Sequence, residues 1–223
     1  AGHGSMIAKN NPITALGETL GQVVAATETP IVLGPMLLLA EALAGQPVDD
    51  AETARDILLK HTGVFRPMIA AALRNTVNAT RLDAGYKENV IPSDASATLD
   101  CRYLPGHEDE LHDALQSALP PQAETTLLRR SPATEPAATG RWFDQMAAAL
   151  RSAAPSARVA PYVFSGGTDN KWFAELDMAT FGFTPLLLPA GFDFPSMFHG
   201  VDERVPLGSL TFGVDVLTAL FTM

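Results

Sequence analysis

The sequence of 223 residues has a single cysteine, Cys101, and few basic side chains. One cysteine excludes an intrachain disulfide and is compatible with a reducing compartment. Lysine and arginine number 15 against 25 aspartates and glutamates, which gives a formal net charge of −10. Because nucleic-acid surfaces need clustered basic residues, we expect no nucleic-acid partner.

Long apolar runs are also missing from the sequence. The longest candidate, residues 31–39, is interrupted by Gly34 and Pro35, and it is far shorter than the roughly 18 residues that a membrane span requires. We therefore expect no membrane partner and a cytoplasmic location. Export stays open, because we expect the natural protein to begin upstream of Ala1. Hydrophobic residues make up 47% and charged residues 18%, which is typical of a globular chain.

Periodicity predicts both helices and strands. A loop rich in proline, alanine and threonine at 131–140 separates two parts of the chain. On the strand 95–103, strict alternation places Cys101 on the apolar face and Arg102 on the solvated face. Helical spacing predicts helices at 13–24, 36–43, 50–59, 64–73, 108–119, 142–153, 170–176 and 207–221, and further strands are expected at 76–82, 124–128, 158–164 and 179–183.

Three short motifs carry residues with chemical potential. Near the end, Phe198-His199-Gly200-Val201-Asp202-Glu203-Arg204 precedes a helix, where a neutral imidazole suits a divalent transition metal. The alternative is a surface histidine beside a helix start. In the middle, Ser165-Gly166-Gly167-Thr168-Asp169 turns from a strand into a helix, exposing backbone N–H groups that bind anions, although such turns also serve as plain helix caps. At the front, Gly2-His3-Gly4-Ser5 is a small-residue loop, with a cloning scar as the alternative.

Together and in this order, the motifs resemble the zinc-dependent M20 metallopeptidases and aminoacylases, in their carboxypeptidase-like and N-acyl-amino-acid hydrolase branch. The resemblance implies an α+β lid, or dimerisation, domain at 1–130, with a four-stranded antiparallel sheet whose first strand is missing and a helical insertion at about 30–74. It implies that 131–223 is the remnant of an α/β catalytic domain.

The resemblance also assigns roles to individual residues. His3 would be catalytic, donating a hydrogen bond to the developing oxyanion. Asn89, in Asn-Val-Ile-Pro, and Arg102 would bind substrate, often through its carboxylate. Gly166, Gly167 and Thr168 would form a substrate-binding loop, and Lys171 stands where the family often has arginine.

His199 would be a metal ligand. Asp202 or Glu203 would orient its ring, or Arg204 would pair with one of these acids and only fix the loop. The side chains of Phe192, Phe194, Met197 and Phe198 line an apolar substrate pocket or pack in the core.

The expected reaction is hydrolysis of the amide bond of peptides or N-acyl amino acids by water bound to two zinc ions. Most of the family's metal ligands and its general-base glutamate lie upstream, and this sequence has neither a suitably flanked His-x-Asp motif nor adjacent glutamates. We therefore expect an inactive C-terminal fragment that binds zinc weakly and forms a homodimer through its lid. The alternative is a non-catalytic dimerisation or binding module.

Overall fold

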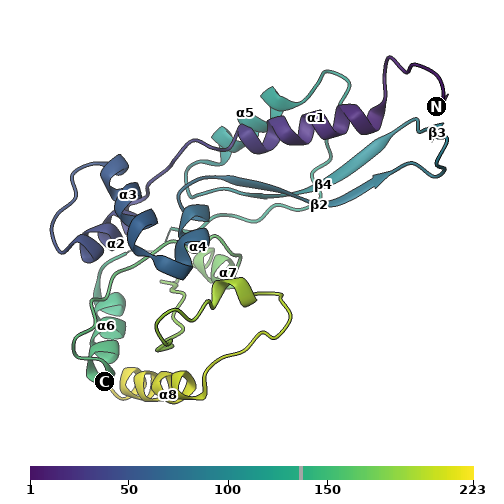
Figure 1. Ribbon diagram of the computed structural model, residues 1–223. Helices are drawn as coiled ribbons and strands as arrows, with labels where there is room; N and C mark the ends of the chain where they lie inside the picture. Colours follow the sequence, from purple (N-terminus) through teal and green to yellow (C-terminus); the bar gives the residue numbers. More distant parts are fainter. Residues whose placement is uncertain (136–137) are drawn as a thin grey trace. The chain divides into compact units, whose positions relative to one another are not determined.

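A computed structural model describes residues 1–135 and 138–223 (Figure 1). These residues fall into two compact units, of which unit 1 comprises 1–30 and 74–131, and unit 2 comprises 31–73 and 132–223. The assignment of 1–130 to a lid and 131–223 to a catalytic domain stays a prediction.

Unit 1 is built on a long two-stranded antiparallel ribbon (Figure 1). β2 (Thr76–Ala84) pairs with β4 (Ala95–Arg102), from Thr76 opposite Arg102 to Ala84 opposite Ala95. The strands predicted at 76–82 and 95–103 are confirmed. A bulge between Ala79 and Arg81 shifts the register, so that the faces of the two strands are realigned midway along the ribbon.

Two helices pack against this ribbon. α1 (Pro12–Ala25) begins after Asn11, whose side chain accepts a hydrogen bond from the Ile13 amide, and α5 (Glu108–Ala118) has three acidic residues in its first turn. Both features are typical of helix starts. The core they enclose contains Val23, Val77, Leu111, Leu99, Cys101 and Leu115. The predicted core position of Cys101 is confirmed, and burial raises the pKa of its thiol.

A second, very short pair of strands lies beside the ribbon's loop. β1 (Gly2–His3) pairs antiparallel with β3 (Val90–Ile91). Among the described residues, the strands thus form two two-stranded sheets, and the predicted four-stranded sheet is not formed. The segment expected to supply its last strand, 124–128, forms no strand, and Leu127 and Leu128 are both 76% exposed. A strand needs a neighbour that accepts its hydrogen bonds, and this segment is not paired with one.

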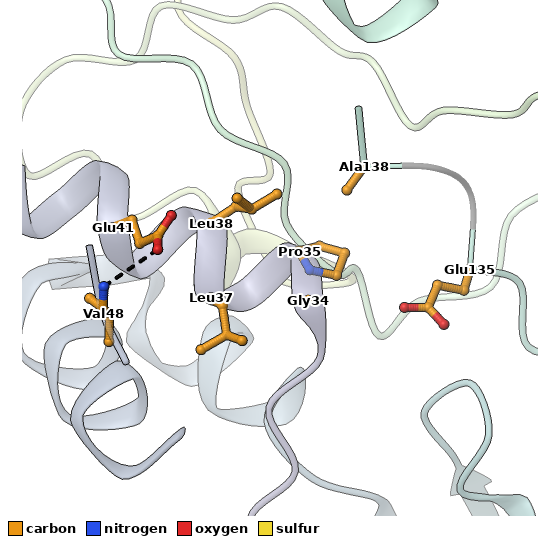
Figure 2. Close-up of a pocket in the computed structure, with 8 residues that line it drawn as sticks. All are labelled: Gly34, Pro35, Leu37, Leu38, Glu41, Val48, Glu135 and Ala138. Atoms are coloured by element: carbon orange, nitrogen blue, oxygen red, sulfur yellow. Dashed lines mark hydrogen bonds between the residues drawn. The ribbon is translucent and has the colours of Figure 1, made fainter. Parts of the chain in front are cut away.

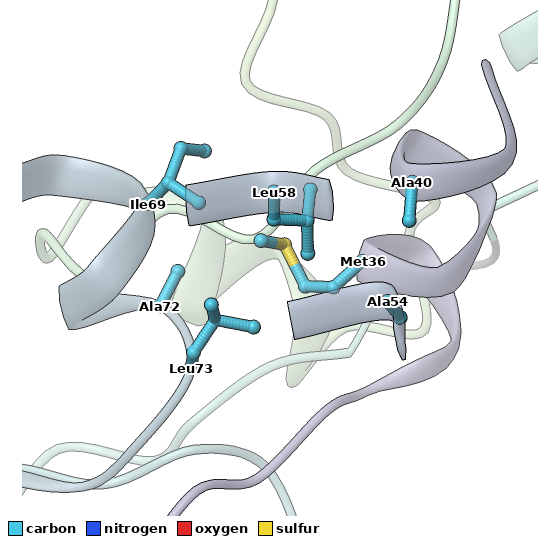
Figure 3. Packing of buried hydrophobic residues seen from close by; sticks show 7 residues of the cluster. All are labelled: Met36, Ala40, Ala54, Leu58, Ile69, Ala72 and Leu73. Carbon is cyan, nitrogen blue, oxygen red and sulfur yellow. The ribbon is translucent and has the colours of Figure 1, made fainter. Parts of the chain in front are cut away.

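In unit 2, four short helical segments surround a well-packed cluster (Figure 3). They are α2 (Gly34–Ala44), α3 (Ala51–His61), a 3₁₀ turn (η1, Gly63–Phe65) and α4 (Arg66–Ala71). Their buried contacts are made by Met36, Ala40, Ala54, Leu58, Ile69, Ala72 and Leu73. The helical content predicted for this stretch is confirmed. Asp50 caps α3 by accepting a hydrogen bond from the Thr53 amide at 2.8 Å, and this bond lowers the pKa of its carboxyl group.

The rest of unit 2 contains α6 (Arg141–Ala153), α7 (Asn170–Ala174), a 3₁₀ turn (η2, Pro195–Met197) and α8 (Leu207–Thr222). α6 and α8 pack against each other. The Ser209 hydroxyl on α8 donates to the Leu187 carbonyl at 2.6 Å, so the segment around Leu187 is fixed to this helix. The described part of unit 2 contains no β-strand.

The predicted α/β sheet is therefore not formed by the described residues. Residues 158–164 and 179–183 are unpaired, and Tyr162 and Phe164 in the first segment are 47% and 46% exposed. Strands of a parallel sheet are satisfied by neighbours on both sides and covered on both faces. Among the described residues, these segments have no neighbouring strands and are not covered on both faces. This explains why their apolar pattern does not produce strands.

Among the residues that the structure describes, no helix is both long enough and apolar enough to cross a membrane.

Candidate functional site

The first candidate residue, His3, ends β1 and lies next to Asn89. The Gly4 amide donates to the Asn89 carbonyl at 2.8 Å, and His3 is paired with Val90. A Cβ atom on Gly4 would lie 3.2 Å from that carbonyl oxygen, so a small residue is needed for this approach. The structure thus brings together two predicted site residues, His3 and Asn89, at the loop end of the ribbon.

The imidazole of His3 is in contact with Ser5. Its Nδ1 atom lies 2.8 Å from Ser5 Oγ and accepts a hydrogen bond from the Ser5 backbone amide at 3.3 Å. Ser5 belongs to the motif Gly2-His3-Gly4-Ser5, but the sequence alone assigned it no role. The signal was its position two residues after the histidine, in a turn of small residues, where hydroxyl side chains commonly bond back to nearby groups.

Arg102 lies at the opposite end of the ribbon. β4 extends roughly 24 Å from Ala95 to Arg102 at about 3.4 Å per residue, so the structure does not bring Arg102 together with His3 and Asn89 within unit 1. Its guanidinium forms a two-point ion pair with Asp100, at 2.5 Å from Nε and 2.7 Å from the terminal nitrogen. The hydrogen bond from Arg102 lowers the pKa of the Asp100 carboxyl group.

This pairing uses two of the five N–H donors of the guanidinium, the group that the family resemblance assigns to a substrate carboxylate. Residues i and i+2 of a strand share a face, so the sequence pattern itself placed Asp100 beside Arg102. The role of Arg102 in substrate binding stays a prediction, and the guanidinium N–H groups that do not face Asp100 are the ones open to a ligand.

In unit 2, the glycine turn at Gly166 and Gly167 leads into α7 (Figure 1). A Cβ atom on Gly166 would overlap the ring of Phe164, so a larger residue here would require that half-exposed ring to move. The Thr168 hydroxyl accepts a weak hydrogen bond from the Asn170 amide at 3.4 Å. Lys171 lies on α7 with its Nζ 5.1 Å from the centre of the Trp172 ring, a cation–π contact. The structure places all four predicted residues of this group within one short segment.

His199 follows η2 on an exposed turn. Its backbone has a φ of 58°, a left-handed conformation that is uncommon outside glycine. The next amide, of Gly200, donates to the Met197 carbonyl at 2.9 Å, and a Cβ atom on Gly200 would lie 3.1 Å from that oxygen. The turn is thus closed behind His199 and leaves its imidazole accessible to solvent.

Asp202 and Glu203 could either orient the His199 ring or pair with Arg204 and fix the loop. The contacts of Asp202 fit the second role. The Arg204 guanidinium donates to the carboxylate of Asp202 and, at 3.0 Å, to its carbonyl. Arg204 also lies 5.9 Å from the centre of the Phe192 ring. Among the described residues, no hydrogen bond links His199 to Asp202 or Glu203, so orientation of the ring by these acids stays a prediction.

The chemistry of the described side chains does not amount to a complete metal centre. Across 1–135 and 138–223, no group of three or more histidine, cysteine, aspartate or glutamate side chains is placed to hold a metal ion. Zinc takes about four ligands in structural sites and three protein ligands in catalytic ones. His199 alone therefore does not make a zinc site.

The aromatic loop before His199 packs on itself. The rings of Phe194 and Phe198 meet edge to face with centres 5.0 Å apart, an arrangement that is typical of packed aromatic pairs. This contact favours local packing over a ready-made substrate pocket.

A pocket of about 580 Å³ lies elsewhere in unit 2 (Figure 2). Its walls are mainly apolar, and the Glu41 carboxylate beside it accepts a hydrogen bond from the Val48 amide at 3.4 Å. None of the predicted site residues lines it. The lining residues are Gly34, Pro35, Leu37, Leu38, Glu41, Val48, Glu135 and Ala138.

Comparison with known families places the chain among peptidases that carry a dimerisation domain. Residues 1–127 match the M20 peptidase dimerisation domain. Because this match covers more than half of the chain, the protein belongs to the M20 family of metallopeptidases and aminoacylases.

Three relatives illustrate the similarity. The human N-fatty-acyl-amino acid synthase/hydrolase PM20D1 is 25% identical over 230 residues, covering 92% of this chain and 43% of that protein. Mouse aminoacylase-1 is 25% identical over 166 residues, covering 70% of this chain and 38% of that protein. A Dictyostelium discoideum protein named "Probable carboxypeptidase S-like 2" is 29% identical over 148 residues, covering 64% of this chain and 28% of that protein. The chain thus spans less than half the length of each of these relatives, and no solved structure matches it.

Proposed function

We propose that this chain is the C-terminal portion of an M20 zinc hydrolase that cleaves the amide bond of peptides or N-acyl amino acids. The observation that supports this most is the match of 1–127 to the family's dimerisation domain, with relatives that are hydrolases. In this proposal 1–130 is the lid with a helical insertion at about 30–74, and 131–223 contributes to the catalytic domain.

His3 is the proposed catalytic residue of this chain. Its place beside β3 and its contact with Ser5 fix it in an exposed turn, where it donates a hydrogen bond to the oxygen of the scissile carbonyl as negative charge develops there. Asn89, in the turn just before β3, offers a neutral amide to the same substrate. In unit 1, Arg102 is a proposed contact for a substrate carboxylate. In unit 2, Gly166, Gly167, Thr168 and Lys171 are the proposed substrate-binding loop.

His199 is the proposed zinc ligand. Since the described residues contain no complete ligand set, the other ligands of two zinc ions would come from outside this chain. Bound zinc supplies a water molecule acidified enough to be deprotonated near neutral pH.

A non-catalytic dimerisation module is the second candidate. It is favoured by the same absence of a ligand cluster among described residues and by a family match that is itself a dimerisation domain. The gene upstream of Ala1 distinguishes the two, because the hydrolase requires an open frame that encodes His-x-Asp and an adjacent glutamate pair.

The decisive experiment restores the upstream segment. We expect the longer protein to hydrolyse a panel of dipeptides and N-acyl amino acids, to lose activity to a chelator and to recover it with zinc. His3→Ala should lower kcat by roughly 10²- to 10³-fold, as for loss of one oxyanion donor, and His199→Ala should reduce bound zinc. His112→Ala, an exposed histidine on α5, is the matched control and should change neither. A correctly folded longer protein without hydrolytic activity on any of these substrates would contradict the proposal.

A further inference from the structure

We infer that Ser5 is a positioning residue that holds the His3 ring in the tautomer with its hydrogen on Nε2. The value of this tautomer for catalysis rests on the proposed function. The tautomer itself depends only on the contacts in the turn that follows β1.

The turn is held at both ends by backbone hydrogen bonds. The Gly4 amide donates to the Asn89 carbonyl at 2.8 Å, and the Met6 amide donates to the His3 carbonyl at 3.0 Å. Ser5 lies between these two bonds, so its amide and its hydroxyl are both turned back toward the preceding histidine. The hydrogen bonds from these two Ser5 groups then select which atom of the ring faces Ser5.

That atom is Nδ1, and the two Ser5 contacts define its protonation. A backbone amide can only donate, so the 3.3 Å contact from the Ser5 amide requires a lone pair on Nδ1. The Ser5 hydroxyl, at 2.8 Å, then also donates to Nδ1. A neutral imidazole has one N–H hydrogen, which must then be on the other nitrogen, Nε2.

This tautomer is the one that an oxyanion donor needs. With Nδ1 occupied by Ser5, the Nε2–H group is the ring's remaining polar group and can donate outward. The opposite tautomer would present a bare lone pair to the substrate oxygen and would repel developing negative charge. Ser5 thereby acts through His3 and need not touch the substrate.

The test is ¹⁵N NMR of the His3 side chain in the 223-residue protein, at a pH above the range in which histidines titrate. The two ring nitrogens report which of them carries hydrogen. We expect an unprotonated Nδ1 in the natural chain and in Ser5→Thr, which keeps the hydroxyl. In Ser5→Ala, loss of one hydrogen bond should lower the ratio of the Nε2–H to the Nδ1–H tautomer by roughly two- to tenfold.

Ser93→Ala is the matched control, because Ser93 also makes a short local bond from an exposed loop, to Asp94 at 2.7 Å. It should leave the His3 signals unchanged. Identical His3 signals in Ser5→Ala and the natural chain, or hydrogen on Nδ1 in the natural chain, would overturn the inference.

Kinetics of the longer enzyme separate this inference from the proposed function. If Ser5 positions a catalytic His3, Ser5→Ala should lower kcat with little change in KM, and Ser5→Thr should restore it. A changed tautomer ratio in Ser5→Ala together with an unchanged kcat in His3→Ala would retain the positioning role of Ser5 and reject the catalytic role of His3.

Discussion

Asn75 shows how one buried polar side chain can hold two segments of unit 1 together. It is 5% exposed, its Oδ1 accepts a hydrogen bond from the Leu104 amide at 2.9 Å, and its Nδ2 donates to the His107 carbonyl at 2.9 Å. Asn75→Ala would leave a buried amide without a partner. We expect a loss of about 1–3 kcal/mol in the free energy of unfolding, measured by urea denaturation. Asn78→Ala, at an exposed site on β2, the strand that follows Asn75, should change it by less than about 0.5 kcal/mol.

The ion pair between Asp100 and Arg102 predicts a pH dependence. Because the hydrogen bond from Arg102 lowers the folded-state pKa of Asp100, its contribution to stability is present above the unfolded value, near 3.9, and is lost as the pH falls through the folded-state pKa. The side chains are 46% and 40% exposed, so solvent screening limits the effect to under about 1 kcal/mol.

The measurement is the difference in unfolding free energy between the natural chain and Asp100→Asn. We expect this difference to favour the natural chain at neutral pH and to shrink as the pH is lowered below about 4. A difference that is the same at both ends of this range would show that the pair contributes nothing through its charge.

Residue-level predictions from the sequence succeeded where the pattern is local. Alternation along 95–103 correctly placed Cys101 in the core and Arg102 on the same face as Asp100. The contact of Ser5 with His3 was missed because it depends on the turn geometry set by pairing with a strand about 85 residues away. The roles of His3 and His199 depend on groups outside the described contacts and remain predictions.

At the scale of elements, α8 offers a sharp test of packing. A Cβ atom on Gly213 would lie 2.7 Å from the Pro185 carbonyl oxygen, whereas at Gly208 it would meet nothing within 4 Å. Alanine favours a helix over glycine by about 1 kcal/mol, so propensity alone predicts that both substitutions stabilise α8.

We expect the two alanine substitutions to change the stability of the chain in opposite directions. Gly208→Ala should leave the melting temperature unchanged or raise it, while Gly213→Ala should destabilise the chain by about 1–3 kcal/mol, since the backbone at Pro185 must move. Thermal unfolding followed by circular dichroism measures both. If Gly213→Ala were as stable as Gly208→Ala, the segment at 185–187 would not be packed on α8 as described.

Helices were predicted better than strands, for a physical reason. A helix satisfies its hydrogen bonds within its own segment, so caps and spacing around Asp50 and Asn11 suffice to locate one. A strand depends on a partner, and the segments 124–128, 158–164 and 179–183 have none among the described residues. This is consistent with the proposal that the sheets predicted to contain these segments also include residues of a longer enzyme.

At the scale of the whole molecule, two sources of self-association must be separated. The family's dimerisation domain predicts a defined homodimer through unit 1. Unit 2 exposes apolar side chains on one stripe of α8 (Leu207, Leu210, Val214, Leu217 and Phe221), and exposed apolar patches favour association without fixed stoichiometry.

Light scattering coupled to size-exclusion chromatography distinguishes them. We expect a species of twice the 23.6 kDa mass of one chain, together with larger species that decrease when Leu210→Glu and Val214→Glu are combined. The dimer itself should persist in this variant, because the lid would form it. Leu111→Glu, in the core of unit 1, should abolish the dimer by unfolding the lid. Loss of the dimer on substitution of α8 alone would place the contact in unit 2 and contradict dimerisation through the lid.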